Sequence, residues 1–225
     1  MERAFVWCGG ALFVGSLSLT AWLYAVWFGT GRPSNGWTPV AIDALLLSLF
    51  ALHHSAFARE PLKRATAKVV PERLTRSLYV WVASSLLILV CVLWQPIGGG
   101  LYWFKGWRAW PFGIAQLAGV WMIARATAAI DALELAGIRN AKVENEELQS
   151  YGAYGLVRHP IYLGWVLVVF CTAHMTGDRL AFAVITTMYL LLAMPWEERS
   201  LERQFGPEYQ RYKERVRWKI IPYLY

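Results

Sequence analysis

The sequence has little charge and few cysteines, and both shortages narrow the classes of protein to consider. Only 16% of its 225 residues are charged, while 57% are hydrophobic. A water-soluble domain of this length could not bury so much apolar surface, so a lipid bilayer is the expected solvent. Cys8, Cys91 and Cys171 lie in apolar stretches and form no Cys-x-x-Cys pair, so neither a disulfide framework nor a zinc site is indicated.

The chain also lacks internal repeats, low-complexity tracts and any linker that would separate a soluble domain from a membrane domain. We therefore expect a single membrane domain over residues 1–225. The N-terminus has one Arg followed by a long apolar run without a clear small-residue cleavage site, which favours a retained first helix over a removed signal peptide.

The net charge of +7 raises the question of nucleic-acid binding, and the distribution of the basic residues answers it. They gather in three clusters next to hydrophobic segments, a pattern typical of orientation by the positive-inside rule and of contact with anionic lipid headgroups. Thirteen Trp and eleven Tyr suit the membrane–water interface. The expected partner is the lipid bilayer, with no nucleic acid.

Apolar runs long enough to span a bilayer, roughly 20 residues each, predict four helices. They cover residues 5–28, 37–58, 78–94 and 110–130. The last apolar stretch, 161–195, is broken near 175–179 into two arms of about 14 to 16 residues, which predicts a helical hairpin. The expected fold is an all-α, polytopic membrane bundle of four spanning helices, followed by this hairpin and an interfacial tail.

Charge predicts the orientation of the helices. The segment between the second and third helices is strongly basic and should face the cytoplasm. It contains Arg59, Lys63, Arg64, Lys68, Arg73 and Arg76. Counting spans from there places residues 139–158 and the tail from Arg199 on the same side of the membrane. The tail is also basic, so the number of spans and the charge of the loops predict the same orientation.

Two polar residues within the second predicted helix require an explanation, because charge inside a bilayer is costly. Asp43 and His54 are eleven residues apart, about three turns, and so share a helix face. They could form a proton relay or supply two metal ligands. Alternatively they satisfy other helices, and no third ligand stands at a recognisable spacing, so we predict no metal site.

Polar residues also flank the predicted hairpin. Pro160 at a helix start leaves backbone N–H groups free to bind an anion, and Arg158 and His159 add donors; an ordinary interfacial helix start is the alternative. Glu197 and Glu198 follow the second arm, where they could hold a cationic ligand or form salt bridges to nearby arginines. The tail after them either caps the cytoplasmic mouth of a site or only anchors the chain in lipid.

These residues together resemble the superfamily of isoprenylcysteine carboxyl methyltransferases and phospholipid methyltransferases. The resemblance is carried by Tyr154-Gly155, by Val157-Arg158-His159-Pro160-Ile161-Tyr162-Leu163-Gly164, by Glu197-Glu198-Arg199-Ser200-Leu201, and by Phe205-Gly206 with Tyr209 and Tyr212. The resemblance covers about the last 75 residues, which lie within an expected cofactor-binding region, 131–225, that follows the four helices in 1–130. It implies S-adenosylmethionine as methyl donor, although the chain has no glycine-rich Rossmann turn.

The resemblance also implies roles for individual residues. The donor-binding residues would be Leu148, Gln149, Tyr154, His159, Pro160, Ile161, Tyr162, Glu197 and Glu198. The acceptor would arrive from the membrane side near His54 and Arg59. No catalytic general base can be assigned. The active site would face the cytoplasm in a bacterial inner membrane.

Two features bear on the methyl acceptor. Ala193 stands where the carboxyl methyltransferases are expected to have an arginine that holds the substrate carboxylate, and the first half of the chain resembles the methanethiol S-methyltransferase branch. A thiol or another small or lipophilic acceptor is therefore expected. The alternatives are carboxyl O-methylation of isoprenylcysteine, phospholipid N-methylation, a nicotinamide-dependent reductase of the sterol type, and a non-catalytic membrane protein.

Overall fold

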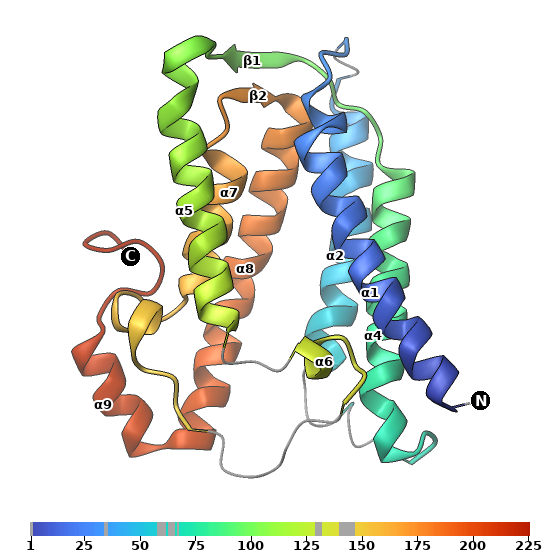
Figure 1. Ribbon diagram of the computed structural model, residues 1–225, viewed down its shortest axis with the longest axis vertical. Coiled ribbons are helices and arrows are strands. Elements are labelled where there is room, and N and C mark those ends of the chain that lie inside the picture. The colour runs from blue at the N-terminus through green and yellow to red at the C-terminus, as the bar shows by residue number, and fades with distance from the viewer. Residues whose placement is uncertain are drawn as a thin grey trace. The chain divides into compact units, whose positions relative to one another are not determined.

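The computed structural model describes residues 2–33, 36–57, 62, 66, 68–128, 132–139 and 147–225. These residues are mostly helical (Figure 1), which confirms the all-α class. Contacts within the chain divide it into two compact units. Unit 1 comprises Met1–Gly99, Ile130–Lys142 and Thr176–Asp178, and unit 2 comprises Gly100–Ala129, Val143–Met175 and Arg179–Tyr225.

Unit 1 is built on three long helices. They are α1 (Glu2–Ala25), α2 (Thr38–Phe57) and α4 (Glu72–Leu93), with the short turns η1 (Trp27–Gly29) and α6 (Ala132–Leu135) beside them. Helix α4 packs against both α1 and α2 (Figure 1). Gly9 permits the close approach of α1 and α4, because a Cβ atom there would lie 2.8 Å from the Trp81 Nε1.

A buried carboxylate fixes the chain after α4. Asp178 is 1% exposed and accepts hydrogen bonds from the Trp94 indole at 2.9 Å, the Ile97 N–H at 3.0 Å and the Gly98 N–H at 2.9 Å. These donors neutralise a carboxylate that would otherwise be costly to bury. This role of Asp178 was not predicted, although an acidic residue in the first turn of a long apolar helix is a signal for such a role.

Unit 2 contains the strands and the C-terminal helices. Its elements are β1 (Gly100–Trp103), η2 (Gly106–Ala109), α5 (Trp110–Thr127), η3 (Gly152–Gly155), α7 (Pro160–Phe170), most of β2 (His174–Thr176), most of α8 (Gly177–Phe205) and α9 (Pro207–Arg215). Strands β1 and β2 pair into a two-stranded sheet. This short sheet, formed where the hairpin turns, was not predicted.

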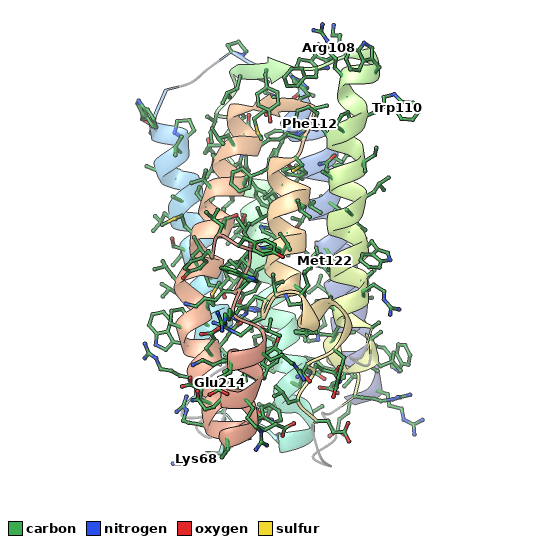
Figure 2. The ribbon with its side chains drawn as sticks, turned by 90° about the vertical axis from the view of Figure 1, so that its left-hand side faces the viewer. Lys68, Arg108, Trp110, Phe112, Met122 and Glu214 are labelled. Atoms are coloured by element: carbon green, nitrogen blue, oxygen red, sulfur yellow. The ribbon has the colours of Figure 1, made fainter. Side chains whose placement is uncertain are left out.

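Helices α5 and α7 pack with their backbones almost in contact. A Cβ atom on Gly119 would lie 2.6 Å from the Gly164 carbonyl oxygen, and one on Gly164 would lie 2.7 Å from the Gly119 carbonyl oxygen. Small residues at a crossing point are typical of helix packing in membranes, where close backbone contact replaces the hydrophobic effect. Figure 2 shows Trp110 pointing outward from α5, whereas Met122 packs against the core of unit 2.

Among the residues that the structure describes, four helical segments are long and apolar enough to cross a membrane, and the chain is a multi-pass membrane protein. They are Glu2–Gly29, Thr38–Phe57, Leu74–Leu93 and Gly177–Phe205. The first three match predicted spans. The predicted span 110–130 is the 18-residue helix α5, in which Trp, Pro, Gln and Arg lower the mean hydropathy. The fourth long apolar helix is α8 instead.

The hairpin has arms of unequal length. The first arm, α7, has 11 residues, and the second, α8, has 29 residues and runs through Pro195. Glu197 and Glu198 therefore lie inside a helix, not in a turn after one. Helix α8 ends at Phe205, because Gly206 adopts a φ of +51° that other residues rarely adopt, and Pro207 starts α9.

Candidate functional site

Arg158 joins three segments of unit 2 at the start of α7. Its Nε donates to the Glu198 Oε1 at 2.8 Å, and its Nη1 donates to the carbonyl oxygens of Val216 at 2.9 Å and Arg217 at 2.8 Å. The side chain is only 6% exposed, so these contacts satisfy a buried cation. The backbone adds to the junction, since the His159 N–H donates to the Lys219 carbonyl at 2.8 Å.

Glu197 and Glu198 have different surroundings although they are neighbours in sequence. The Glu198 side chain is 12% exposed and bonds to Arg158. The Glu197 side chain is 50% exposed and accepts the Tyr162 hydroxyl at 2.5 Å. Successive residues of a helix point about 100° apart, which accounts for the difference. Glu198 is thus engaged within the protein, whereas half of Glu197 remains accessible.

The imidazole of His159 lies between the two carboxylates. Its Nε2 is 3.2 Å from the Glu198 Oε1, and its Nδ1 is 3.7 Å from the Glu197 Oε2. The ring also stacks on Tyr162, with centroids 5.1 Å apart and planes inclined by 21°. Four predicted donor-binding residues, His159, Tyr162, Glu197 and Glu198, therefore form one cluster. This cluster places a half-exposed carboxylate beside two stacked, buried rings, and such a carboxylate can attract an organic cation.

The start of α7 offers fewer free N–H groups than the sequence suggested. The N–H groups of Tyr162 and Leu163 donate to the His159 carbonyl at 3.0 and 3.1 Å. Pro160 has no N–H, so in the first turn only Ile161 has an N–H without an acceptor among the described residues. Pro160 itself is buried and Ile161 is half-buried. An anion at this helix start would meet one backbone donor and not several.

Three more predicted donor-binding residues lie in the segment 147–156. Tyr154 is in η3, Leu148 is half-buried against Tyr209 and Tyr212, and Gln149 is exposed. Burial raises the pKa of the Tyr154 hydroxyl, and the nearby Glu197 charge raises it further. Tyr154 therefore remains a neutral phenol.

The predicted acceptor-binding residues belong to unit 1. His54 has its Nδ1 2.6 Å from the Tyr79 hydroxyl, and its ring stacks on Phe50. Arg59 lies outside the described residues. The His53 ring stacks on Tyr79 at 5.8 Å, and neither of its ring nitrogens has a hydrogen-bond partner in the part of the chain that the structure describes.

Asp43 and His54 do not share a partner in the described contacts. Asp43 is fully buried, and its Oδ1 accepts the Gln95 N–H at 2.8 Å, while its Oδ2 has no partner. Within the described part of the chain, no group of three or more His, Cys, Asp or Glu side chains is placed to hold a metal ion. The alternative in which each residue satisfies other helices fits this geometry better than a shared ligand set.

A hollow of about 530 Å³ lies on α8 close to the cluster. It is lined by Trp196, Arg199, Glu202 and Arg203. These residues lie on either side of Glu197 and Glu198 in the helix and do not include them, so this hollow is separate from the carboxylate cluster.

Curated relatives identify the class of protein that these features define. Methanethiol S-methyltransferase 2 of Bradyrhizobium diazoefficiens is 37% identical over 204 residues, which are 87% of this chain and 78% of the relative. Methanethiol S-methyltransferase of Crocosphaera subtropica is 34% identical over 195 residues, 83% of this chain and 76% of the relative. A Nurim homolog of Drosophila melanogaster is 25% identical over 207 residues, 81% of this chain and 78% of the relative.

The protein is a membrane methyltransferase. More particularly, the chain belongs to the methanethiol S-methyltransferase family, which confirms the resemblance found in the sequence. No protein-family model matches the chain. No solved structure matches it either.

Proposed function

We propose that the protein transfers a methyl group from S-adenosylmethionine to a small thiol of the methanethiol type. The names of its relatives support the thiol acceptor. The observation that carries the proposal is the half-exposed carboxylate of Glu197, which lies against the stacked, buried rings of Tyr162 and His159. A sulfonium cation is the kind of group that such a carboxylate attracts.

The residues of the cluster fit this donor in different roles. Glu197, Tyr162, His159 and Tyr154 would contact it, together with Leu148, Gln149, Pro160 and Ile161 around them. Glu198, whose carboxylate is occupied by Arg158 and His159, would hold His159 in place from behind. When bound, S-adenosylmethionine supplies an activated methyl group for an in-line displacement.

The protein's contribution to the reaction would be positioning and the exclusion of water, since methyl transfer from a sulfonium needs little other help. The acceptor must react as a thiolate, which is the nucleophilic form of a thiol. We propose that the acceptor meets His54 and Arg59, and that the site faces the cytoplasm of a bacterial inner membrane. Clusters of basic residues beside the apolar helices support this orientation.

A direct experiment supplies S-adenosylmethionine with a labelled methyl group to the protein purified in detergent. Methanethiol, a prenylcysteine and phosphatidylethanolamine are offered in parallel reactions. Label in dimethyl sulfide alone is the expected result. Label in the prenylcysteine ester or in the phospholipid alone would replace the proposed acceptor, and folded protein that binds no donor in calorimetry would contradict the proposal altogether.

The carboxyl methyltransferase alternative rests on the shared C-terminal motifs, and Ala193 argues against it. An alanine at that position cannot hold a substrate carboxylate, whereas a thiol needs no such cation. The nicotinamide-dependent reductase finds no support among the relatives described above.

A further inference from the structure

Helix α9 holds the segment 147–156 through two hydrogen bonds. The Tyr212 hydroxyl donates to the Tyr154 carbonyl at 2.9 Å, and the Arg215 Nη2 donates to the Ser150 carbonyl at 3.0 Å. The Arg215 guanidinium also lies 5.4 Å from the centre of the Tyr151 ring. Among the described residues, these are the only hydrogen bonds that join 147–156 to another element of unit 2.

Apolar packing joins the same two elements. Tyr209 is 0% exposed and Tyr212 is 4% exposed, and Leu148 packs against the cluster that they form with Val216. Helix α9 is in turn fixed to α8, because the Lys213 ammonium bonds to the Glu202 carboxylate at 2.5 Å. The segment 147–156 is thus supported by α9, and α9 is supported by α8. Otherwise the segment has one short turn, η3, which lies against α5.

Burial keeps Tyr212 in the form that can donate. It raises the pKa of the Tyr212 hydroxyl, and likewise that of Tyr209, so both remain protonated over the working pH range. The two tyrosines differ in their hydrogen bonding. The Tyr212 hydroxyl has an acceptor, whereas the Tyr209 hydroxyl has no acceptor among the described residues and lies near the Arg158 guanidinium.

We propose that Tyr212 and Arg215 are positioning residues that set the affinity for the methyl donor by holding the segment 147–156 in its binding conformation. This inference rests on the proposed function, because Leu148, Gln149 and Tyr154 are expected donor contacts. A segment with so few contacts of its own opens at small cost once its hydrogen bonds are removed. Donor binding must then order it again, and the apparent dissociation constant becomes the intrinsic one divided by the fraction of time the segment is closed.

The test compares two substitutions that delete the same atom from the same helix. Tyr212→Phe removes a hydroxyl that donates to the Tyr154 carbonyl, and Tyr209→Phe removes one that has no acceptor. We expect Tyr212→Phe to raise the Kd for S-adenosylmethionine about five- to tenfold, the effect of one hydrogen bond. Tyr209→Phe should leave it unchanged. At saturating donor, kcat and the KM for the acceptor should stay at wild-type values in both.

A second pair of substitutions tests the hydrogen bond of Arg215. It keeps the inference testable if Tyr212→Phe does not fold. Arg215→Gln removes the bond to the Ser150 carbonyl, whereas Arg211→Gln changes an exposed residue of the same helix. Hydrogen exchange of residues 147–156 without donor should quicken in Tyr212→Phe and Arg215→Gln only. Donor affinity equal to wild type in both variants would overturn the inference, as would a fall in kcat at unchanged donor affinity.

Failure of the underlying function is distinguishable from failure of this inference. If the wild-type protein is folded but binds no S-adenosylmethionine, the proposed function is wrong. If the wild-type protein binds it and Glu197→Gln does not, while Tyr212→Phe and Arg215→Gln bind normally, only the role of α9 is wrong.

Discussion

Glu198 and Arg158 form a buried ion pair whose loss should destabilise the protein. The two side chains are 12% and 6% exposed, and the guanidinium also caps the Val216 and Arg217 carbonyl oxygens. Glu198→Ala leaves a buried cation without its counter-charge, which costs about 3 kcal/mol. We expect a clear fall in the thermal unfolding midpoint in detergent without donor. Glu208→Ala, at an exposed carboxylate of α9, is the matched control and should leave the midpoint unchanged.

Substitution of Glu197, in contrast to that of Glu198, should weaken donor binding and leave the stability almost unchanged. Because half of its side chain is exposed, Glu197→Gln should change the stability by less than about 0.5 kcal/mol. It should weaken S-adenosylmethionine binding by at least about tenfold, since contacts to charged groups contribute about 1.5–3 kcal/mol. Calorimetric titration of donor into each variant measures this. Equal donor affinity in wild type and Glu197→Gln would remove Glu197 from the donor site.

At the scale of elements, the crossing of α5 and α7 depends on two glycines. Gly119→Ala places a methyl group 2.6 Å from the Gly164 carbonyl oxygen, so the helices must separate. We expect a loss of about 1–3 kcal/mol in stability, measured by unfolding in detergent. Gly113→Ala on the same helix has open space around its new Cβ and should be neutral or slightly stabilising. A similar loss from both substitutions would mean that the close crossing does not matter.

The sequence predicted some boundaries of these elements and missed others for physical reasons. The break near residues 175–179 was predicted, and α8 begins there at Gly177, because glycine and charged residues in an apolar stretch are local signals. The continuation of α8 past Pro195 was not predicted. A proline removes only one helical hydrogen bond, and packing of the neighbouring Met194, 1% exposed, supports the helix on both sides of it.

In the candidate site, too, features set by the local sequence could be predicted, whereas features set by contacts between distant segments could not. The motif around His159 and the adjacent glutamates could be recognised from sequence, as the family of the chain confirms. The sequence could not show which of Glu197 and Glu198 remains accessible, because this depends on the contact of Arg158 with Glu198, 40 residues away in sequence. The role proposed for Tyr212 likewise depends on a contact between segments 58 residues apart. The donor and acceptor roles of these residues stay predictions.

For the whole molecule, the orientation in the membrane is the property that the sequence predicts and labelling can test. Arg108 and Glu214 lie at opposite ends of unit 2 (Figure 2). The end that holds α9 is strongly basic and should face the cytoplasm. Its basic residues are Arg199, Arg203, Arg211, Lys213, Arg215, Arg217 and Lys219.

Single cysteines introduced into a chain in which Cys8, Cys91 and Cys171 are replaced by Ala provide the measurement. In intact bacterial spheroplasts, an impermeant maleimide should label Arg108→Cys at once. It should label Arg211→Cys only after the membrane is opened, because that position would face the cytoplasm. Both sites are exposed in the protein, so a difference in labelling reports the side of the membrane and not burial. Immediate labelling of Arg211→Cys, with Arg108→Cys protected until lysis, would reverse the orientation and place the Glu197 cluster on the outer side.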